Sequence, residues 1–297
     1  MKLAEFDAWM RCEADAVERA LQAWVPADAP AGLGHAMRYG VLDGGKRVRP
    51  LLVLAAAQAV HGPREVAMRA ACAVELIHAY SLVHDDMPCM DNDVLRRGKP
   101  TVHVRFGEAQ AMLAGDAMQA LAFEVLTPDE SAGVPAALQA RLCALLARAA
   151  GHAGMAGGQA IDLASIGRPL DEQALRDMHH RKTGALLQAS VLMGAACGQA
   201  TRAEWTALAA YGDALGLAFQ VVDDILDVTQ ASATLGKTAG KDLDNNKPTY
   251  VTVLGLDAAR RHAAELRDKA QDALARSGLS DAAWLSLLAD KVVERDS

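Results

Sequence analysis

Apolar residues recur at intervals of three and four positions along almost the whole chain, which is the spacing of one helix face. Runs of this kind cover residues 71–83, 137–150, 186–197, 205–227 and 258–275. Runs that alternate apolar and β-branched residues with polar ones, as half-buried strands do, are nearly absent. Glycines and prolines interrupt the pattern at regular intervals, so we expect about ten or more helices joined by loops. The pattern predicts an all-α bundle.

The chain has no shift in composition and no internal repeat, so we expect residues 1–297 to form a single domain. Hydrophobic residues make up 52% of the sequence, which is ample for a large core. The net charge is −7, which disfavours a nucleic-acid-binding protein because such proteins carry a basic face.

The sequence shows no sign of secretion or of membrane insertion. Residues 1–20 are interrupted by acids and lack the apolar stretch of a signal peptide. The longest apolar run, residues 51–60, is far shorter than a membrane span. The 5 cysteines are widely spaced and form no CxxC pair, so we expect reduced thiols and a cytoplasmic location.

Two clusters of aspartates follow apolar helical runs, in the segments HDDMPCMD (84–91) and QVVDDILD (220–227). In the second cluster, Asp223 and Asp227 are four residues apart and share one helix face. In the first, the six steps from Asp85 to Asp91 turn a helix by about 240°, so one continuous helix cannot bring them together. Pro88 predicts a break in that helix, which lets Asp91 return towards Asp85.

Clustered carboxylates indicate a site for cations. Two carboxylates about 4 Å apart repel by roughly 4 kcal/mol at an effective dielectric of about 20, so clustering is costly without a counter-ion. Oxygen ligands without histidine or cysteine nearby suit Mg²⁺, which keeps waters and bridges to substrate phosphates. A single pair is better interpreted as a solvated helix end, but two clusters on apolar helices favour metal binding.

Basic segments accompany the aspartates and indicate an anionic substrate. They are GGKRVRP (44–50), RRGK (96–99), RKTG (181–184) and the lysines of 237–241. Arginine and lysine in such loops fit phosphate oxygens. Residues 40–46 have the glycine and lysine spacing of a P-loop, but Arg47 stands where serine or threonine is required and no strand precedes it. His179 and His180 are expected to be exposed polar residues of a helix.

The chain resembles the short-chain (E)-prenyl diphosphate synthase family, and within it the bacterial farnesyl diphosphate synthase (geranyltranstransferase) group. The resemblance runs from about residue 32 to the C-terminus and is carried by the segments GGKRVRP, ELIHAYSLVHDDMPCMDNDVLRRGKPT, GGQAIDL, HHRKTGALL, GLAFQVVDDILD and LGKTAGKDLDNNKPTYV. It implies an isoprenoid synthase fold, with helices around a central cavity. It also implies a homodimer that condenses isopentenyl diphosphate with dimethylallyl and then geranyl diphosphate to farnesyl diphosphate.

The resemblance also implies roles for individual residues. About three Mg²⁺ ions, which Mn²⁺ can replace, would bind to the carboxylates of Asp85, Asp86, Asp91, Asp223, Asp224 and Asp227. The allylic diphosphate would be held by Arg96, Lys182 and Lys237. Isopentenyl diphosphate would be held by Gly45, Lys46, Arg49, His78 and Arg97. Lys182, Thr183 and Gln220 would be the catalytic residues. Backbone carbonyls and the oxygens of Thr183 and Gln220 would stabilise an allylic cation by their dipoles, in a pocket that excludes water. The ions would stabilise the departing diphosphate as Lewis acids.

Product length is expected to depend on Tyr80 and Ser81 in the helix before Asp85. Tyr80 is five residues earlier, about 7.5 Å along the axis, and Ser81 shares the stripe of Asp85. In the family, an aromatic at this position with the two-residue insertion Pro88-Cys89 is typical of enzymes that make C15 products. We therefore interpret Tyr80 as the floor of the product pocket, although packing between two helices would also explain it.

Two positions depart from the family pattern, and four other functions remain open. Val94 stands where an aspartate is common, and Lys291 replaces a frequent aromatic residue. The alternatives are a geranyl or geranylgeranyl diphosphate synthase, a terpene cyclase, a regulatory subunit of a prenyl synthase and a carboxylate-rich metal-storage bundle. Cyclases lack the GGKR segment and regulatory subunits tend to lose an aspartate motif. Storage bundles need inward Glu-x-x-His pairs, which we do not find.

Overall fold

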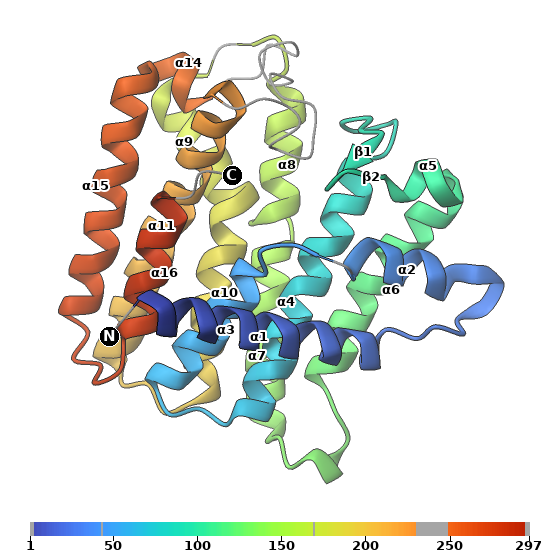
Figure 1. The fold of residues 1–297 in the computed structure, drawn as a ribbon, viewed down its shortest axis with the longest axis horizontal. Helices are drawn as coiled ribbons and strands as arrows, with labels where there is room; N and C mark the ends of the chain where they lie inside the picture. Colours follow the sequence, from blue (N-terminus) through green and yellow to red (C-terminus); the bar gives the residue numbers. More distant parts are fainter. Residues whose placement is uncertain (1–2, 43, 169, 230–248, 295–297) are drawn as a thin grey trace.

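The computed structural model describes residues 3–42, 44–168, 170–229 and 249–294. Helices make up nearly all of its regular structure (Figure 1): α1 (Leu3–Trp24), α2 (Leu33–Val41), α3 (Val48–Ala59), α4 (Arg64–Asp85), α5 (Val102–Phe106), α6 (Glu108–Leu126), α7 (Ala136–Ala150), α8 (Met155–Ala164), α9 (Glu172–His179), α10 (Ala185–Cys197), α11 (Arg202–Thr229), α14 (Tyr250–Leu254), α15 (Leu256–Ala275) and α16 (Ala283–Val293). Three short turns, η1 (Pro30–Gly32), η2 (Glu130–Ala132) and the π-helical η3 (His180–Gly184), complete the helical part. The all-α prediction is confirmed.

The helices end close to where the sequence pattern places them. The run predicted at 137–150 becomes α7 (136–150), and those at 186–197 and 258–275 become α10 and α15 with shifts of one or two residues.

One small feature was not predicted from the sequence. Strands β1 (Leu95–Arg96) and β2 (Lys99–Pro100) form an antiparallel hairpin after the first aspartate cluster, with Arg96 paired to Lys99. A two-residue strand is too short to show an alternating pattern.

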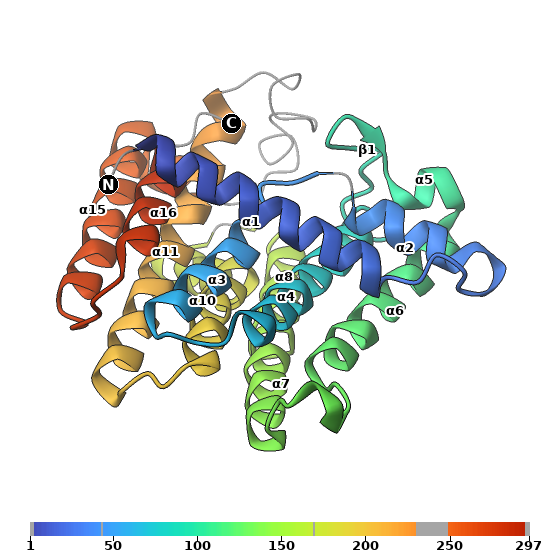
Figure 2. The same cartoon turned by 60° about the horizontal axis from the view of Figure 1, so that its bottom comes forward.

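Helix α4 is the central helix of the bundle and contacts α3, α6 and α10. Alanines and large aliphatic residues cover it on several sides, so it is buried over most of its length. Its length and hydropathy would suffice for a membrane span, but 67% of its most apolar window is buried inside the bundle, as befits a core helix. Figures 1 and 2 show α1 crossing the long helices obliquely on the outside of the bundle.

Helices α11 and α15 pack along much of their lengths. On α15 five of the six buried residues are spaced alternately by four and three positions: Ala259, Ala263, Leu266, Ala270 and Ala273. This spacing forms one narrow stripe, which is the geometry of two nearly parallel or antiparallel helices in close contact. The small alanines allow the close approach that holds α11, and therefore its aspartates, in place.

The first aspartate cluster confirms the predicted helix break. Helix α4 ends at Asp85, three residues before Pro88, and the chain then turns back. The backbone N–H of Asp91 donates to the carbonyl of Asp85 over 2.8 Å, so the two aspartates are brought together by a turn. The N–H of Asp93 likewise donates to the carbonyl of Asp86 over 3.1 Å, which closes the turn.

Candidate active site

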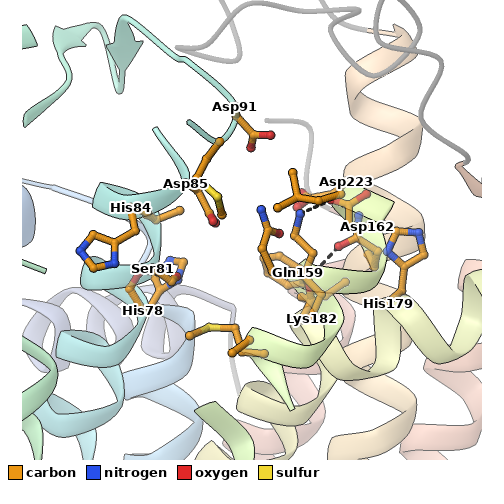
Figure 3. A pocket seen from close by; sticks show the side chains of 18 of the residues that line it. His78, Ser81, His84, Asp85, Asp91, Gln159, Asp162, His179, Lys182 and Asp223 are labelled. Carbon is orange, nitrogen blue, oxygen red and sulfur yellow. Dashed lines mark hydrogen bonds and ion pairs between the residues drawn. The ribbon is translucent and has the colours of Figure 1, made fainter. Parts of the chain in front are cut away.

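A cavity of about 660 Å³ lies between α4, α8, η3 and α11 (Figure 3). Most of the residues singled out from the sequence line it, although they come from segments far apart in the chain. The lining residues predicted from the sequence are Arg49, His78, Tyr80, Ser81, Asp85, Asp91, Arg96, Arg97, Lys182, Thr183, Gln220, Asp223 and Asp224. The fold therefore gathers both aspartate clusters and three of the basic segments at one place.

Four other predicted residues are not among those that line the cavity. Gly45 and Lys46 are exposed in the loop before α3. Asp86 and Asp227 are buried, with 3% and 6% of their surfaces exposed. Lys237 lies outside the described residues, so the structure says nothing of its expected role.

The carboxylates form two facing walls of the cavity. Asp85 and Asp91 project from the end of α4 and the turn after it, and Asp223 projects from α11 on the opposite side (Figure 3). Burial raises the pKa of Asp85 to about 6; the Lys182 ammonium opposes this rise, while the charge of Asp91 adds to it. A cation bound beside Asp85 would stabilise the ionised carboxylate and so offset the cost of its burial.

The buried Asp86 pairs with the partly buried Arg96 beside this wall. The Nε atom of Arg96 donates to both carboxylate oxygens over 2.9 Å, and its Nη2 donates to Oδ1 over 2.6 Å. Burial raises the pKa of Asp86, and the hydrogen bonds from Arg96 oppose that rise. Arg96 also lines the cavity, so Asp86 holds the positive charge of this guanidinium at the edge of the cavity.

Lys182 and Thr183 reach the cavity from the π-helical turn η3. A π-helical turn accommodates an extra residue, so the side chains that follow it point to different faces of the helix. Such turns often occur at functional sites. The backbone of Lys182 lies directly against α8, since a Cβ added to Gly158 would be only 2.2 Å from its nitrogen. The Lys182 ammonium forms an ion pair with Asp162 of α8 over 2.5 Å (Figure 3).

A chain of hydrogen bonds runs from Thr183 to the start of α14. The Thr183 hydroxyl donates to Gln220 Oε1 over 3.0 Å, and Gln220 Nε2 donates to Asp224 Oδ1 over 2.8 Å. The other oxygen of Asp224 accepts from the backbone N–H of Tyr250 over 2.8 Å. Because each donor has a defined acceptor, the chain fixes the orientation of the Thr183 and Gln220 oxygens.

The basic side of the cavity carries Arg49, His78 and Arg97. Arg49 lies over the Phe219 ring, with 5.8 Å between the guanidinium carbon and the ring centroid. Burial lowers the pKa of His78 well below its usual value, and the charges of Arg49 and Arg97 lower it further. His78 is therefore a neutral hydrogen-bonding group on a side of the cavity that carries arginines.

The deeper wall of the cavity is formed by α4 where it faces α6. Tyr80 and Ser81 line the cavity, and Gln119 Nε2 donates to the Tyr80 hydroxyl over 3.5 Å. The His84 ring lies edge-on to Tyr80, with 5.7 Å between centroids, and bonds to the carbonyl of Met112 over 3.0 Å. Tyr80 is thus held by contacts from both helices.

Several lining residues were given no role from the sequence. Gln159 and Asp162 are three residues apart on α8, so they share the face that meets the cavity. Gln159 is 8% exposed, and neither its oxygen nor its nitrogen has a hydrogen-bond partner. The sequence carries a signal for these two residues, because they are a polar pair in an otherwise apolar helix and follow two glycines.

The expectation of an exposed His179 is wrong. Its ring is only 5% exposed, lines the cavity and stacks on Tyr250, with 5.4 Å between centroids. Burial lowers its pKa to about 3, and the charge of Lys182 contributes to the decrease. His180 differs, since it is only partly buried and pairs with Asp213 over 2.9 Å.

The donor set of the cavity fits Mg²⁺ bound together with a phosphorylated substrate. Within the described ranges, no three histidine, cysteine, aspartate or glutamate side chains lie close enough to hold an ion by themselves. Mg²⁺ is commonly bound by one or two carboxylates, with waters and substrate phosphates completing the octahedron. The separated carboxylates of Asp85, Asp91 and Asp223 fit that mode, with Arg96 and Lys182 available to phosphate oxygens.

The cavity combines facing carboxylates, basic side chains at its edge and apolar residues in its lining. This combination defines a class of all-α proteins that bind diphosphates together with divalent ions. The chain belongs to the polyprenyl synthetase family, whose sequence model matches residues 30–282. It is therefore a prenyltransferase of this family with the isoprenoid synthase fold, and the predicted resemblance is confirmed.

Three similar proteins illustrate the relationship. A chloroplastic geranylgeranyl pyrophosphate synthase of Catharanthus roseus is 46% identical over 294 residues, which cover 99% of this chain and 82% of the relative. The crystal structure of an FPP/GFPP synthase from Zymomonas mobilis is 40% identical, covers 98% of this chain and 99% of its own, and has a TM-score of 0.87. A geranyltransferase from Helicobacter pylori, solved with magnesium and isoprenyl diphosphate, is 34% identical, with coverages of 96% and 95% and a TM-score of 0.83.

These comparisons correct one prediction and weaken another. The expected cytoplasmic location is contradicted, because the Catharanthus roseus relative is named as a chloroplastic enzyme. Farnesyl specificity is not confirmed, because that relative is named for the C20 product and the Zymomonas mobilis enzyme for more than one product. Magnesium and prenyl diphosphates are ligands of this family, as the Helicobacter pylori structure shows.

Proposed function

We propose that this protein joins isopentenyl diphosphate to allylic diphosphates in a Mg²⁺-dependent, head-to-tail condensation. The observation that carries the proposal is the pair of carboxylate walls, Asp85 with Asp91 and Asp223, that face each other across one cavity. Basic side chains lie beside both walls. Such an arrangement suits a diphosphate whose charge increases as it departs.

Asp85, Asp91 and Asp223 would hold the magnesium ions, and Asp86 would act by holding Arg96. Asp224 would hold Gln220, since both of its oxygens accept hydrogen bonds within the protein. When bound, magnesium supplies Lewis-acid stabilisation of the negative charge on the departing diphosphate. The number of ions stays a prediction of about three, from the family resemblance.

The residues of the chain would perform three tasks in the reaction. Arg96 and Lys182 would bind the allylic diphosphate, so the carbon–oxygen bond breaks with the diphosphate held in place. The oxygens of Thr183 and Gln220 would face the resulting allylic cation and stabilise it by fixed dipoles. The double bond of isopentenyl diphosphate then forms the new carbon–carbon bond, and one proton leaves to the released diphosphate.

Isopentenyl diphosphate would bind at the basic side of the cavity. Arg49, His78 and Arg97 line this side, and the exposed Lys46 and Gly45 lie in the loop that leads to it. A neutral His78 can donate one hydrogen bond to a phosphate oxygen without adding charge.

We propose geranylgeranyl diphosphate as the main product, a choice supported by the name and the 46% identity of the Catharanthus roseus relative. Farnesyl diphosphate is the second candidate, because Tyr80 lies on the cavity wall and is held by Gln119 from α6. A bulky ring there would stop a growing chain early.

The test is turnover of isopentenyl diphosphate with dimethylallyl, geranyl or farnesyl diphosphate in the presence and absence of Mg²⁺, followed by chromatography of the products. We expect Mg²⁺-dependent condensation and a loss of at least about 10³-fold in D85A, because the variant lacks a carboxylate of the metal wall. A C20 product supports the main proposal, and a product that stops at C15 supports the second candidate. Turnover that ignores Mg²⁺ would contradict both.

We also propose that the protein is a homodimer, as the family resemblance implies. Val104 of α5 and Met112 and Leu113 of α6 are exposed apolar side chains on neighbouring helices, which a second copy could cover. Sedimentation or light scattering of the purified chain should give twice the mass of 31.3 kDa. A mass of one chain at micromolar concentration would contradict this proposal.

A further inference from the structure

The loop before α3 contains an arginine that does not face the cavity. Arg47 lies between Lys46 and Arg49, both expected to bind isopentenyl diphosphate, but only 4% of its surface is exposed. Its backbone adopts φ 48° and ψ 32°, in the left-handed region that residues with a Cβ rarely occupy. Such a conformation persists only where surrounding contacts hold it.

Three contacts hold the Arg47 side chain inside the bundle. Its Nη1 donates to Glu75 of α4 over 2.5 Å, and its Nη2 donates to Glu18 of α1 over 2.5 Å. The same Nη2 donates to the carbonyl of Val41, at the end of α2, over 2.7 Å. One guanidinium thus joins α1, α2 and α4 at the base of the loop.

These contacts connect the loop to the helix that carries the rest of the site. Glu75 is 2% exposed and lies three residues before His78, so the two share a side of α4. The carbonyl of Arg47 accepts from the N–H of Leu51 over 3.0 Å, which begins α3. Arg47 therefore sets where α3 starts, and with it the position of Arg49 relative to His78.

The outer side of the loop is covered by another arginine. Arg97 Nη1 donates to the carbonyl of Gly44 over 2.6 Å, and a Cβ at Gly45 would lie 2.7 Å from its Nη2. The loop is thus held between Arg97 at the cavity and Arg47 in the interior. A shift of Arg47 would move the glycines that allow Arg97 its position.

We propose that Arg47 is a positioning residue for the isopentenyl diphosphate site, an inference that rests on the proposed function. By pairing with Glu75 and Glu18 it holds the left-handed turn that directs Lys46 and Arg49 to the substrate. The allylic site is built from α8, η3 and the β1 region, none of which contacts Arg47 through these bonds. Loss of Arg47 should therefore weaken the binding of one substrate and spare the other.

The chain offers a matched control in Arg64. Its guanidinium donates to both oxygens of Glu13 over 2.7 and 2.8 Å, so it also joins α4 to α1 by an arginine–glutamate pair. That pair lies at the first residue of α4, at the opposite end from Asp85, and neither of its residues lines the cavity. R64Q thus removes a similar link between the same two helices without touching the loop.

The experiment measures KM separately for isopentenyl and geranyl diphosphate in the wild type, R47K, the double variant R47Q with E75Q, and R64Q. Replacing both partners avoids leaving a buried charge without its partner. An unpaired buried charge would destabilise the fold for a reason unrelated to substrate binding. We expect the KM of isopentenyl diphosphate to rise at least tenfold in the double variant and by an intermediate amount in R47K. The KM of geranyl diphosphate should stay within twofold, and R64Q should match the wild type.

Equal increases in both KM values, or no increase in a folded variant, would overturn the positioning role. If the double variant does not fold, E18Q carries the test, because Glu18 is partly exposed and its loss is better tolerated. An unchanged KM there would also overturn it. A wild type without turnover would instead contradict the proposed function, and calorimetric titration of isopentenyl diphosphate would still compare the same variants.

Discussion

Asp85 combines burial with repulsion from neighbouring acids, and its pKa of about 6 is the consequence. The ordinary value for aspartate is about 3.9, so the folded state favours the protonated form more than the unfolded state does. Stability associated with that proton is fully present below about pH 4 and is lost as the pH rises through about 6. A half-buried carboxylate that costs stability at neutral pH is consistent with a role in binding cations.

The first prediction concerns this cost. In buffer without divalent ions, D85N should be more stable than the wild type at pH 8 by about 1–2 kcal/mol, because it removes an ionised, half-buried carboxylate whose cost solvent partly screens. At pH 4 the difference should nearly vanish. Thermal or urea unfolding at both pH values measures it, with D116N, at an exposed site on α6, as the control. Equal stabilisation at both pH values would contradict the explanation.

The second prediction concerns Tyr80. Replacing it by alanine removes a ring that lies beside His84 and accepts a hydrogen bond from Gln119. The cavity should deepen along α4, and the mean product should lengthen by at least one C5 unit. Chromatography of products made from geranyl diphosphate tests this, with Y39F, at a tyrosine away from the cavity, as the control. A Y80A variant with unchanged product length would refute the role of Tyr80 as the floor.

At the scale of elements, the contact between α8 and η3 decides where Lys182 and Thr183 lie. Gly158 allows the two backbones to touch, and the ion pair of Lys182 with Asp162 joins the same elements. The π-helical turn therefore packs against Gly158 on one side and against α11 on the other, where Gln220 accepts a hydrogen bond from the Thr183 hydroxyl. Two catalytic candidates depend on this packing.

The third prediction follows from that contact. G158A places a methyl group where only 2.2 Å separates it from the Lys182 nitrogen, so η3 must shift. A displacement of about 1 Å at a reacting group can cost about 10²-fold in rate, and we expect kcat to fall by that order. Steady-state kinetics measure it. A164S, an exposed change at the end of the same helix, should keep wild-type rates, and a fully active G158A would show that η3 tolerates the shift.

At the scale of the whole molecule, the carboxylate walls lie on opposite sides of the cavity and come from different helices. Asp85 ends the central helix and Asp223 lies near the end of α11, so a ligand between them connects two parts of the fold. The net charge of −7 is partly concentrated here, since each aspartate cluster contributes three acids. Cations bound between the walls should relieve repulsion and stabilise the bundle.

The fourth prediction tests this connection without turnover. Mg²⁺ and inorganic diphosphate together should raise the melting temperature more than the sum of their separate effects, since a ligand that binds only the folded state stabilises it. We expect an increase of several degrees. D223N removes one wall and should abolish the cooperative part, whereas D268N, an exposed acid on α15, should preserve it. Merely additive effects would contradict a bridging role.

Much of the fold could be predicted from the sequence, because helix periodicity is a local property. The ends of α7, α10 and α15, and the break before Pro88, depend on residues within a turn or two of each other. The β1–β2 hairpin could not be predicted because its two-residue strands are too short to show an alternating pattern. The burial of His179 could not be predicted because it depends on neighbours that are remote in the sequence, such as Tyr250. The same is true of Gln159, whose place in the cavity depends on how α8 packs.

The sequence alone determined the helical class, the family and the chemical types of the site: clustered carboxylates, basic loops and a tyrosine before the first aspartate. Periodicity and local charge are sufficient for these, because they require only the order of residues along the chain. The tertiary structure alone decided which groups meet. It paired Asp86 with Arg96, turned Asp224 towards the backbone of Tyr250, and buried Arg47 between Glu18 and Glu75. These pairings join segments that only the folded chain brings together, and burial makes each polar contact too costly to leave unmade.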